Sequence, residues 1–164
     1  MKKWLLLAVL LCVVVGVRAD FFTQQVTAKI EPMIQIEWPD AEFSFGDLVA
    51  GPNETPVMPL KVISNIPYEL ELSTESICLK EFIPEQGTYG EITMMEPLKV
   101  SIDGGSTWKI LAKLMVLAKK TEISGTEDIY NLKYQQVFRF PGDKALDEGR
   151  VYKTGITIWV IPMI

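Results

Sequence analysis

Short runs of alternating apolar and polar residues, separated by Pro, Gly, Asn and Asp, dominate the chain after residue 20. In one run Tyr68, Leu70 and Leu72 alternate with Glu69 and Glu71. Since successive side chains of a strand point to opposite faces of a sheet, this period predicts half-buried antiparallel strands. The pattern predicts strands over residues 25–30, 33–38, 60–63, 68–72, 98–102, 108–118, 129–140 and 151–161. The fold class that follows is all-β, an immunoglobulin-like antiparallel β-sandwich of about eight to nine strands.

The run TWKILAKLMVLAKK fits two periods. Lys109, Lys113 and Lys120 would share one stripe of a helix, whereas the apolar residues at alternate positions 110–118 would share one face of a strand. The preceding Asp-Gly-Gly is a strong hairpin turn, which favours the strand.

The motif SIDGGSTW at residues 101–108 resembles the Asp-box of sialidases and other propeller hydrolases. A propeller needs several blades of about 40 to 50 residues, and this chain contains the motif once. As a turn, the motif needs no substrate: Asp103 accepts backbone N–H groups, Gly104 and Gly105 supply positive φ angles, and Trp108 begins the return strand and covers the turn. We therefore interpret these four residues as a structural hairpin.

Tyr152 follows the loop residue Gly149 and enters the last alternating run. Sandwich domains place a tyrosine corner at such a position, where the hydroxyl binds the preceding loop. The sequence predicts that structural role for Tyr152.

The first twenty residues have the layout of a secretory signal peptide. Lys2 and Lys3 precede the apolar run WLLLAVLLCVVVGV, and Ala19 ends it before Asp20. The run is shorter than the roughly 20 apolar residues of a spanning helix, and the bulky residue before Cys12 disfavours a lipoprotein. We predict a signal peptide at 1–19, one domain at 20–164, a secreted, periplasmic or cell-surface location, and no membrane span after cleavage.

Charge and cysteine content narrow the class further. Without the signal peptide, 13 basic residues remain against 21 acidic ones, a net charge of −8. Such a surface repels nucleic acid and anionic membranes, so neither is expected as a partner. Cys78 would be the one remaining cysteine, so no internal disulfide is expected, and its apolar neighbours favour a buried, inert thiol.

Sets of catalytic residues are missing from the sequence. The chain has no histidine, which excludes Ser-His and Cys-His systems and most zinc sites. Two acidic groups lack the spacing of a calcium loop and are interpreted as solvated: Asp40, Glu42 and Asp47, and Asp143, Asp147 and Glu148. We predict no catalysis, no metal and no cofactor.

Aromatic residues offer an alternative, a carbohydrate-binding module. Most of them fall on inward phases of the predicted strands, so we assign them to the core. Tyr89, in the predicted loop EQGTYGE, is the best candidate for an exposed ligand contact.

Three stretches together carry a resemblance: Phe45-Gly46-Asp47 with the Gly-Pro-Asn-Glu loop, LKVISNIPYELEL, and GRVYKTGITIWVIP. This order is similar to that of small secreted bacterial sandwich domains of the pilin-like and spore-coat-U-like kind. The resemblance implies a non-enzymatic surface or periplasmic domain, and pilin-like relatives assemble by donating an extended N-terminal strand. Residues 20–30, DFFTQQVTAKI, would be that donor, although the chain lacks the disulfide common in those families and 26–30 equally suits a first strand of its own domain.

The sequence thus predicts a non-enzymatic structural or adhesion-type protein of the cell envelope. The alternatives are a carbohydrate-binding module and a pilin-like subunit that assembles by strand donation. The expected partners are other envelope proteins, further copies of the chain, or a glycan.

Overall fold

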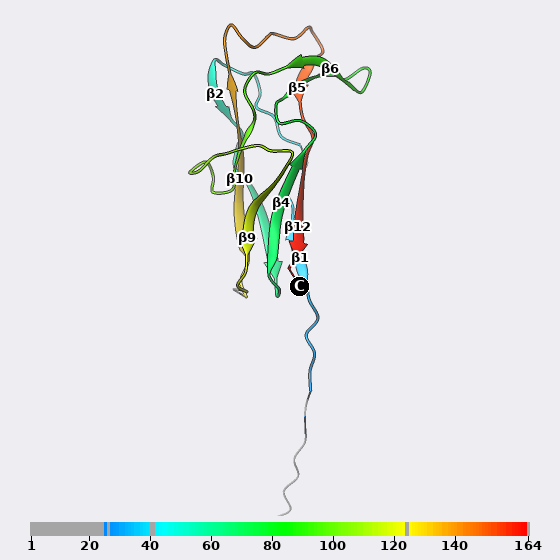
Figure 1. The fold of residues 1–164 in the computed structure, drawn as a ribbon, viewed down its shortest axis with the longest axis vertical. Helices are drawn as coiled ribbons and strands as arrows, with labels where there is room; N and C mark the ends of the chain where they lie inside the picture. Colours follow the sequence, from blue (N-terminus) through cyan, green and yellow to red (C-terminus); the bar gives the residue numbers. More distant parts are fainter. Residues whose placement is uncertain (1–24, 26, 40–41, 124, 164) are drawn as a thin grey trace, which may run out of the picture. The chain divides into compact units, whose positions relative to one another are not determined.

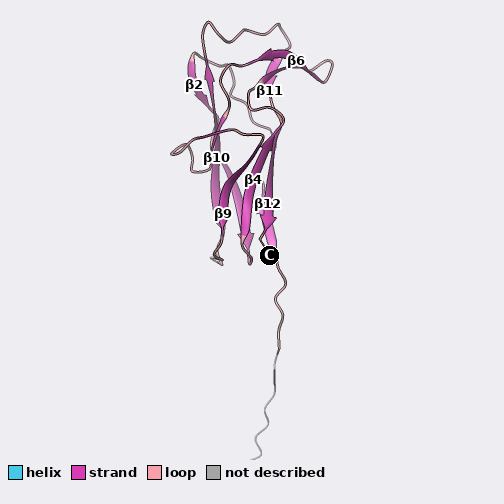
Figure 2. Cartoon of the chain, in the orientation of Figure 1, coloured by secondary structure: helices cyan, strands magenta, loops and turns pink. Residues whose placement is uncertain are grey.

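The computed structural model describes residues 25, 27–39, 42–123 and 125–163. Over these residues the chain forms twelve strands in antiparallel sheets and no helix (Figure 2). The prediction of an all-β antiparallel sandwich is confirmed. The predicted signal peptide at 1–19 lies outside the described residues.

The chain divides into two units, residues 1–31 and 32–164. In the first unit, residues 25 and 27–31 belong to no strand and are exposed. The prediction of a strand at 25–30 is therefore wrong for its described residues. Alternation makes a segment suitable for a sheet, but a strand forms only where another strand supplies hydrogen-bond partners.

The larger sheet of the second unit has the order β1-β3-β10-β7-β8, with β2 paired to the second half of β10. Its long central strand is β10 (Figure 1). Residues 128–132 of β10 pair with β3, and residues 133–135 pair with β7. The bounds are β1 Ile34–Glu37, β2 Gly51–Glu54, β3 Met58–Ser64, β7 Lys99–Ser101, β8 Lys109–Ile110 and β10 Asp128–Phe138.

Two three-stranded sheets complete the unit, in the orders β12-β4-β9 and β11-β5-β6. In the first of these, Trp159 of β12 lies opposite Glu71 of β4, which lies opposite Val116 of β9. The bounds are β4 Tyr68–Thr74, β5 Lys80–Ile83, β6 Thr88–Thr93, β9 Leu114–Lys120, β11 Val151–Lys153 and β12 Ile156–Pro162.

The predicted number of strands is too low for two reasons. The run at 108–118 is interrupted at 111–113, and the run at 151–161 is interrupted at 154–155, so each becomes two strands. Strands β2, β5 and β6 were not expected, because residues such as GPNE in β2 lack the alternating pattern and owe their extension to pairing with β10.

The core lies between the larger sheet and the β12-β4-β9 sheet. Inward residues of β3, β4, β7 and β10 are almost completely buried, and each side chain of this size contributes roughly 1.5–3 kcal/mol on burial. The buried cluster comprises Leu60, Leu70, Leu72, Leu79, Met94, Leu98, Val100, Leu111, Leu117, Leu132 and Tyr134.

Aromatic residues divide between this core and the surface. Tyr68 and Tyr134 are buried, and Phe43 stacks on Tyr134 with ring centroids 4.6 Å apart. Trp38 and Trp159, however, are 51% and 41% exposed, which corrects their assignment to the core. Trp159 lies on the outer face of β12, on the phase opposite the half-buried Ile156, Ile158 and Val160, and Trp38 directly follows β1.

Candidate functional site

The two lateral edges of the sandwich differ. At one edge β8, the last strand of the larger sheet, meets β9, the last strand of its partner sheet. Lys109 Nζ of β8 donates a hydrogen bond of 3.0 Å to the Leu117 carbonyl oxygen of β9. Leu111, in the link between the two strands, is only 2% exposed and its N–H donates to the Leu98 carbonyl oxygen at 2.8 Å. Chain and side chains therefore seal this edge, which we call the closed edge.

The opposite edge of the sandwich is formed by β1, the first strand of the larger sheet, and β12, the first strand of its partner sheet. We call it the open edge. Within the part of the chain that the structure describes, β12 pairs only with β4, and β1 only with β3. The inward residues of β12, Ile156, Ile158 and Val160, pack against the core but stay half-buried. Inward residues of the adjacent β4 are at most 1% exposed up to Leu72. Apolar core surface is therefore accessible along β12.

The strand order explains this opening. An immunoglobulin domain has strands A, B, E and D in one sheet and C, F and G in the other. The neighbours β1-β3-β10-β7 follow the order A-B-E-D, and β12 beside β4 follows F beside C, whereas β9, on the other side of β4, comes after β7 in the chain and has no counterpart in this scheme. Among the described residues no strand occupies the place of G, on the free side of β12.

Residues 27–31 alternate as a strand does, and they pair with no strand among the described residues. Ile30 is 84% exposed, and Lys29 makes only a 4.0 Å contact with Glu31, both side chains being more than four-fifths exposed.

The Asp103 turn joins β7 to β8. Asp103 Oδ1 accepts hydrogen bonds from Ser101 Oγ at 2.6 Å and from Thr107 N at 2.9 Å, and Oδ2 accepts one from Thr107 Oγ1 at 2.6 Å. Gly104 and Gly105 have φ angles of 73° and 101°, and the ring of Trp108 lies against Gly105. The loop is seven residues long rather than tight, because β8 begins only at Lys109.

These hydrogen bonds determine the chemistry of the carboxylate. The hydroxyls of Ser101 and Thr107 and the Thr107 N–H hold the pKa of Asp103 far below its usual range. Both carboxylate oxygens accept bonds from the hairpin itself, and Gly104 N–H attaches the turn to the Asn131 carbonyl oxygen at 2.9 Å. The Asp103 carboxylate thus fixes the loop between β7 and β8 through the hydroxyls of Ser101 and Thr107 and the Thr107 N–H.

Tyr152 lies in β11, and its hydroxyl donates a 2.8 Å hydrogen bond to the carbonyl oxygen of Lys144, eight residues upstream. Its ring packs against the core cluster, and burial raises the pKa of the phenol. This is the geometry of a tyrosine corner, with the loop held to the strand that follows it.

Tyr89 lies in strand β6 rather than in the loop where the sequence placed it, and it is 41% exposed. Its ring meets that of Phe82 edge-on, with centroids 5.3 Å apart, and Lys153 Nζ lies 4.9 Å from the Phe82 centroid. Burial and a hydrogen bond with Glu75 raise the pKa of the Tyr89 phenol.

The two acidic groups have different environments. Asp143 is 6% exposed, which corrects its interpretation as solvated: it accepts 2.7 Å hydrogen bonds from the N–H groups of Met95 and Arg139. Asp147 and Glu148 are exposed, as are Glu42 and Asp47, while Asp40 lies outside the described residues. In the described part of the chain no three acidic or thiol side chains converge on a metal position.

Glu81 carries a buried charge that the sequence pattern did not predict. Glu81 is 4% exposed, forms an ion pair with Arg150, and accepts a hydrogen bond from the Ile92 N–H. A Cβ atom on Gly90 would stand 2.1 Å from the Glu81 carboxylate, so the carboxylate occupies the space that this glycine leaves. Arg150 lowers the pKa of Glu81, and the pair attaches the β11-β5-β6 sheet to the chain before β11. The Glu between Lys80 and Phe82 reads in sequence as an ordinary outward residue, so no pattern indicated it.

Cys78 is half-buried rather than fully buried. Burial, followed by the charges of Glu96 and Asp143, raises the pKa of its thiol. The reactive thiolate form is therefore disfavoured.

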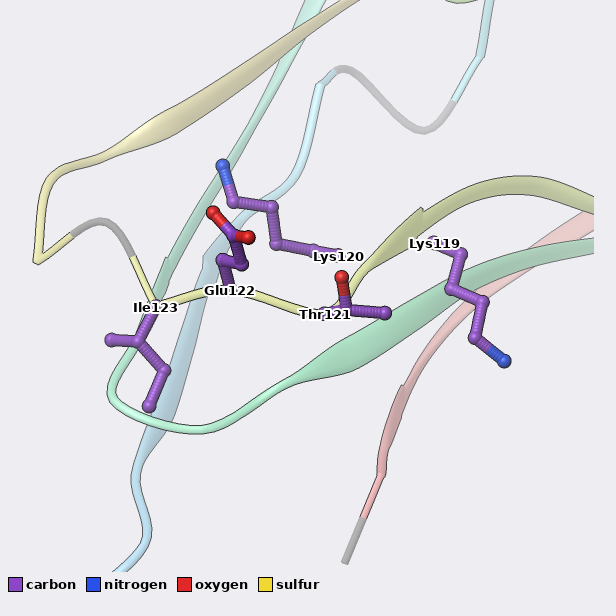
Figure 3. Close-up of a pocket in the computed structure, with 5 residues that line it drawn as sticks. All are labelled: Lys119, Lys120, Thr121, Glu122 and Ile123. Carbon is purple, nitrogen blue, oxygen red and sulfur yellow. The ribbon is translucent and has the colours of Figure 1, made fainter.

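A shallow depression of 290 Å³ lies at the end of β9, lined by Lys119, Lys120, Thr121, Glu122 and Ile123 (Figure 3). The side chains of Lys120 and Glu122 lie close to each other, while Lys119 points away from both. Lys120 also pairs with Asp128 at 2.7 Å, and the phenol of Tyr68 donates to that carboxylate. The ammonium groups of Lys119 and Lys120 are thus paired within the chain, with Glu69 and Asp128.

Comparisons with protein-family models, with curated proteins and with solved structures find no match. The described residues include no helix of the length and hydropathy that crossing a membrane requires. The open edge exposes apolar core surface along β12.

Proposed function

We propose that this protein is a non-enzymatic structural subunit of the cell envelope, and that copies assemble by strand addition at the open edge. In this assembly residues 25–31 of one copy pair with β12 of the next. The observation that carries the proposal is the half-buried row Ile156, Ile158 and Val160 on β12, a strand whose only partner among the described residues is β4.

Strand addition would have two effects: it would pair backbone groups of β12 and bury apolar side chains. On one side of β12 no strand of the described residues pairs with the backbone, and a donor strand would supply hydrogen bonds there. Ala28 and Ile30 share one phase of the donor, so both side chains face the apolar groove when the segment pairs with β12. Burial of Ile30 and of the three β12 residues removes apolar surface from water on both partners.

The resemblance to pilin-like domains and the layout of the first nineteen residues support the location. A secreted or periplasmic subunit would lose residues 1–19 and expose a short N-terminal segment, which is the donor. The excess of acidic residues suits a protein on an outer surface and works against nucleic-acid partners.

A mixing experiment tests the proposal. The variant Ile30→Asp cannot donate, and because Ile30 is 84% exposed the domain stays folded. The variant Ile158→Asp cannot accept, and Ile158→Thr replaces it if the aspartate prevents folding. We expect each variant alone to be monomeric in analytical ultracentrifugation, and the mixture to form a one-to-one dimer. Association of Ile30→Asp equal to that of the unmodified chain would refute strand donation.

Tyr89 supports a second candidate, a glycan-binding surface. Its exposed ring stands beside Phe82, and an aromatic ring of this kind can stack on a pyranose. Glycan-array binding that Tyr89→Ala abolishes would support this role, whereas an array without signal for the unmodified protein would exclude it for the sugars displayed.

A further inference from the structure

The outer face of the β12-β4-β9 sheet carries an unusual arrangement of side chains. Trp159 and Ile161 on β12 are 41% and 40% exposed, and Leu114 and Val116 on β9 are 62% and 46% exposed. Between these two apolar columns runs β4 with Glu69 and Glu71 pointing outward. Glu71 lies directly opposite Trp159 on one side and Val116 on the other.

The two glutamates differ in their partners. Glu69 forms a 2.5 Å ion pair with Lys119 of β9. The Glu71 carboxylate forms no ion pair or hydrogen bond with the described residues. Together with Leu114, Trp159 and Ile161 it lines a shallow depression of 430 Å³. A carboxylate in an apolar frame favours a cation that reaches it across apolar or aromatic surface.

A donor strand beside β12 would bring such a cation. This step rests on the proposed function. If Ala28 and Ile30 face the core, Lys29 must face outward, on the same side of the sheet as Trp159. That conclusion holds for parallel and antiparallel pairing alike, since the side-chain period is two in both.

We propose that Lys29 of one copy crosses the Trp159 ring of the next and pairs with its Glu71. The donor and β4 would be separated by two strand spacings, about 9.5 Å. The extended lysine side chain spans roughly 6 Å of this distance, and the glutamate side chain reaches toward it from β4. The aliphatic stem of Lys29 covers the Trp159 indole. Its ammonium group then forms a cation–π contact with the ring and an ion pair with the Glu71 carboxylate.

This contact specifies register. Sliding the donor by two residues keeps the apolar phase inward, so the groove alone accepts several positions. With Lys29 beside Trp159 the charge meets Glu71, whereas a slide in either direction places Thr27 or Glu31 beside Trp159. Lys29 is available for this role because its contact in its own chain is a 4.0 Å exposed pair, which contributes little.

A charge exchange tests the contact in the full chain. We expect Lys29→Glu and Glu71→Lys each to weaken association about fivefold, the scale of an exposed charge pair on an aromatic ring. The double variant, which restores opposite charges, should recover most of the loss. Trp159→Ala should also weaken association, and in that background Lys29→Glu should have a smaller effect.

Two controls match the changes in net charge. Glu85→Lys and Lys144→Glu alter exposed residues in loops away from this sheet, and they should leave association within twofold of the unmodified protein. An equal loss in these controls would attribute the effect to overall charge and overturn the inference.

The outcomes also separate this inference from the proposed function. If Ile30→Asp abolishes association while the charge variants change nothing, or the double variant shows no recovery, strand donation stands and the Lys29–Glu71 contact is refuted. If Ile30→Asp leaves association intact, strand donation itself fails and the contact fails with it.

Discussion

The closed edge and the open edge of the sandwich contain similar residues but bury them differently. At the closed edge Leu111 and Leu117 are 2% and 3% exposed, because the link between β8 and β9 covers the gap between the sheets. At the open edge the inward residues Ile156, Ile158 and Val160 are as apolar, yet only half-buried. Burial at a sandwich edge therefore depends on which chain segment crosses that edge, not on the hydropathy of the edge strand.

The largest expected difference between the edges is in core stability. Leu111→Ala removes a sealed side chain and should lower the free energy of unfolding by about 2–5 kcal/mol. Ile158→Ala should cost less than half as much in the monomer, since its side chain already contacts water. Urea unfolding monitored by tryptophan fluorescence measures both, and equal losses would show that the open edge is as well packed as the closed one.

Amide hydrogen exchange should be faster along the open edge than in the interior of the same sheet. Amides of β4 are protected by strands on both sides, whereas those on the free side of β12 should exchange far faster. Association at concentrations where the donor is bound should protect the β12 amides and leave those of β4 unchanged. Protection of β12 that does not depend on concentration would argue against an open edge.

Acid should weaken the closed edge through its hairpin. Because the folded state lowers the pKa of Asp103, its contribution to stability is present above about pH 4, the ordinary range of an aspartate, and is lost as the pH falls below it. Asp103→Asn should therefore lower stability at pH 7 and reduce the fall in melting temperature between pH 5 and pH 2.5. Parallel pH profiles for the two proteins would contradict this assignment.

The smallest effect is expected on the outer surface of the open edge. Trp159→Ser removes a ring that is 41% exposed, and it should change the stability of the monomer by only about 0.5 kcal/mol. A loss of several kcal/mol would mean that Trp159 belongs to the core, as the alternating pattern first indicated. The thermal melt of the dilute protein distinguishes the two results.

The sequence predicted local features well where the chemistry is local. Alternation at 68–72 and 129–140 corresponds to β4 and β10, and the segment after the Asp-Gly-Gly turn is extended rather than helical. For the Asp103 carboxylate, the partners are Ser101 and Thr107, two and four residues away. Such contacts need only turn geometry, so they can be read from neighbouring residues.

Long-range contacts were not predictable in the same way. Glu81 meets Arg150 across 69 residues, and Asp143 receives the Met95 N–H across 48. The outward position of Trp159 likewise depends on which phase of β12 packs against the core, and this is the phase of Ile156, Ile158 and Val160. Each depends on strand order, and one sequence does not contain that order in its periodicity.

The sequence by itself determined that the chain is an antiparallel β protein with a hairpin at Asp103, because side-chain period and turn residues act over a few positions. Only the tertiary structure decided that one edge of the sandwich is sealed and the other is open. The physical reason is that an edge is closed by a neighbour supplied from elsewhere in the chain, and residues 27–31, which have the right alternation, pair with no strand of the described chain.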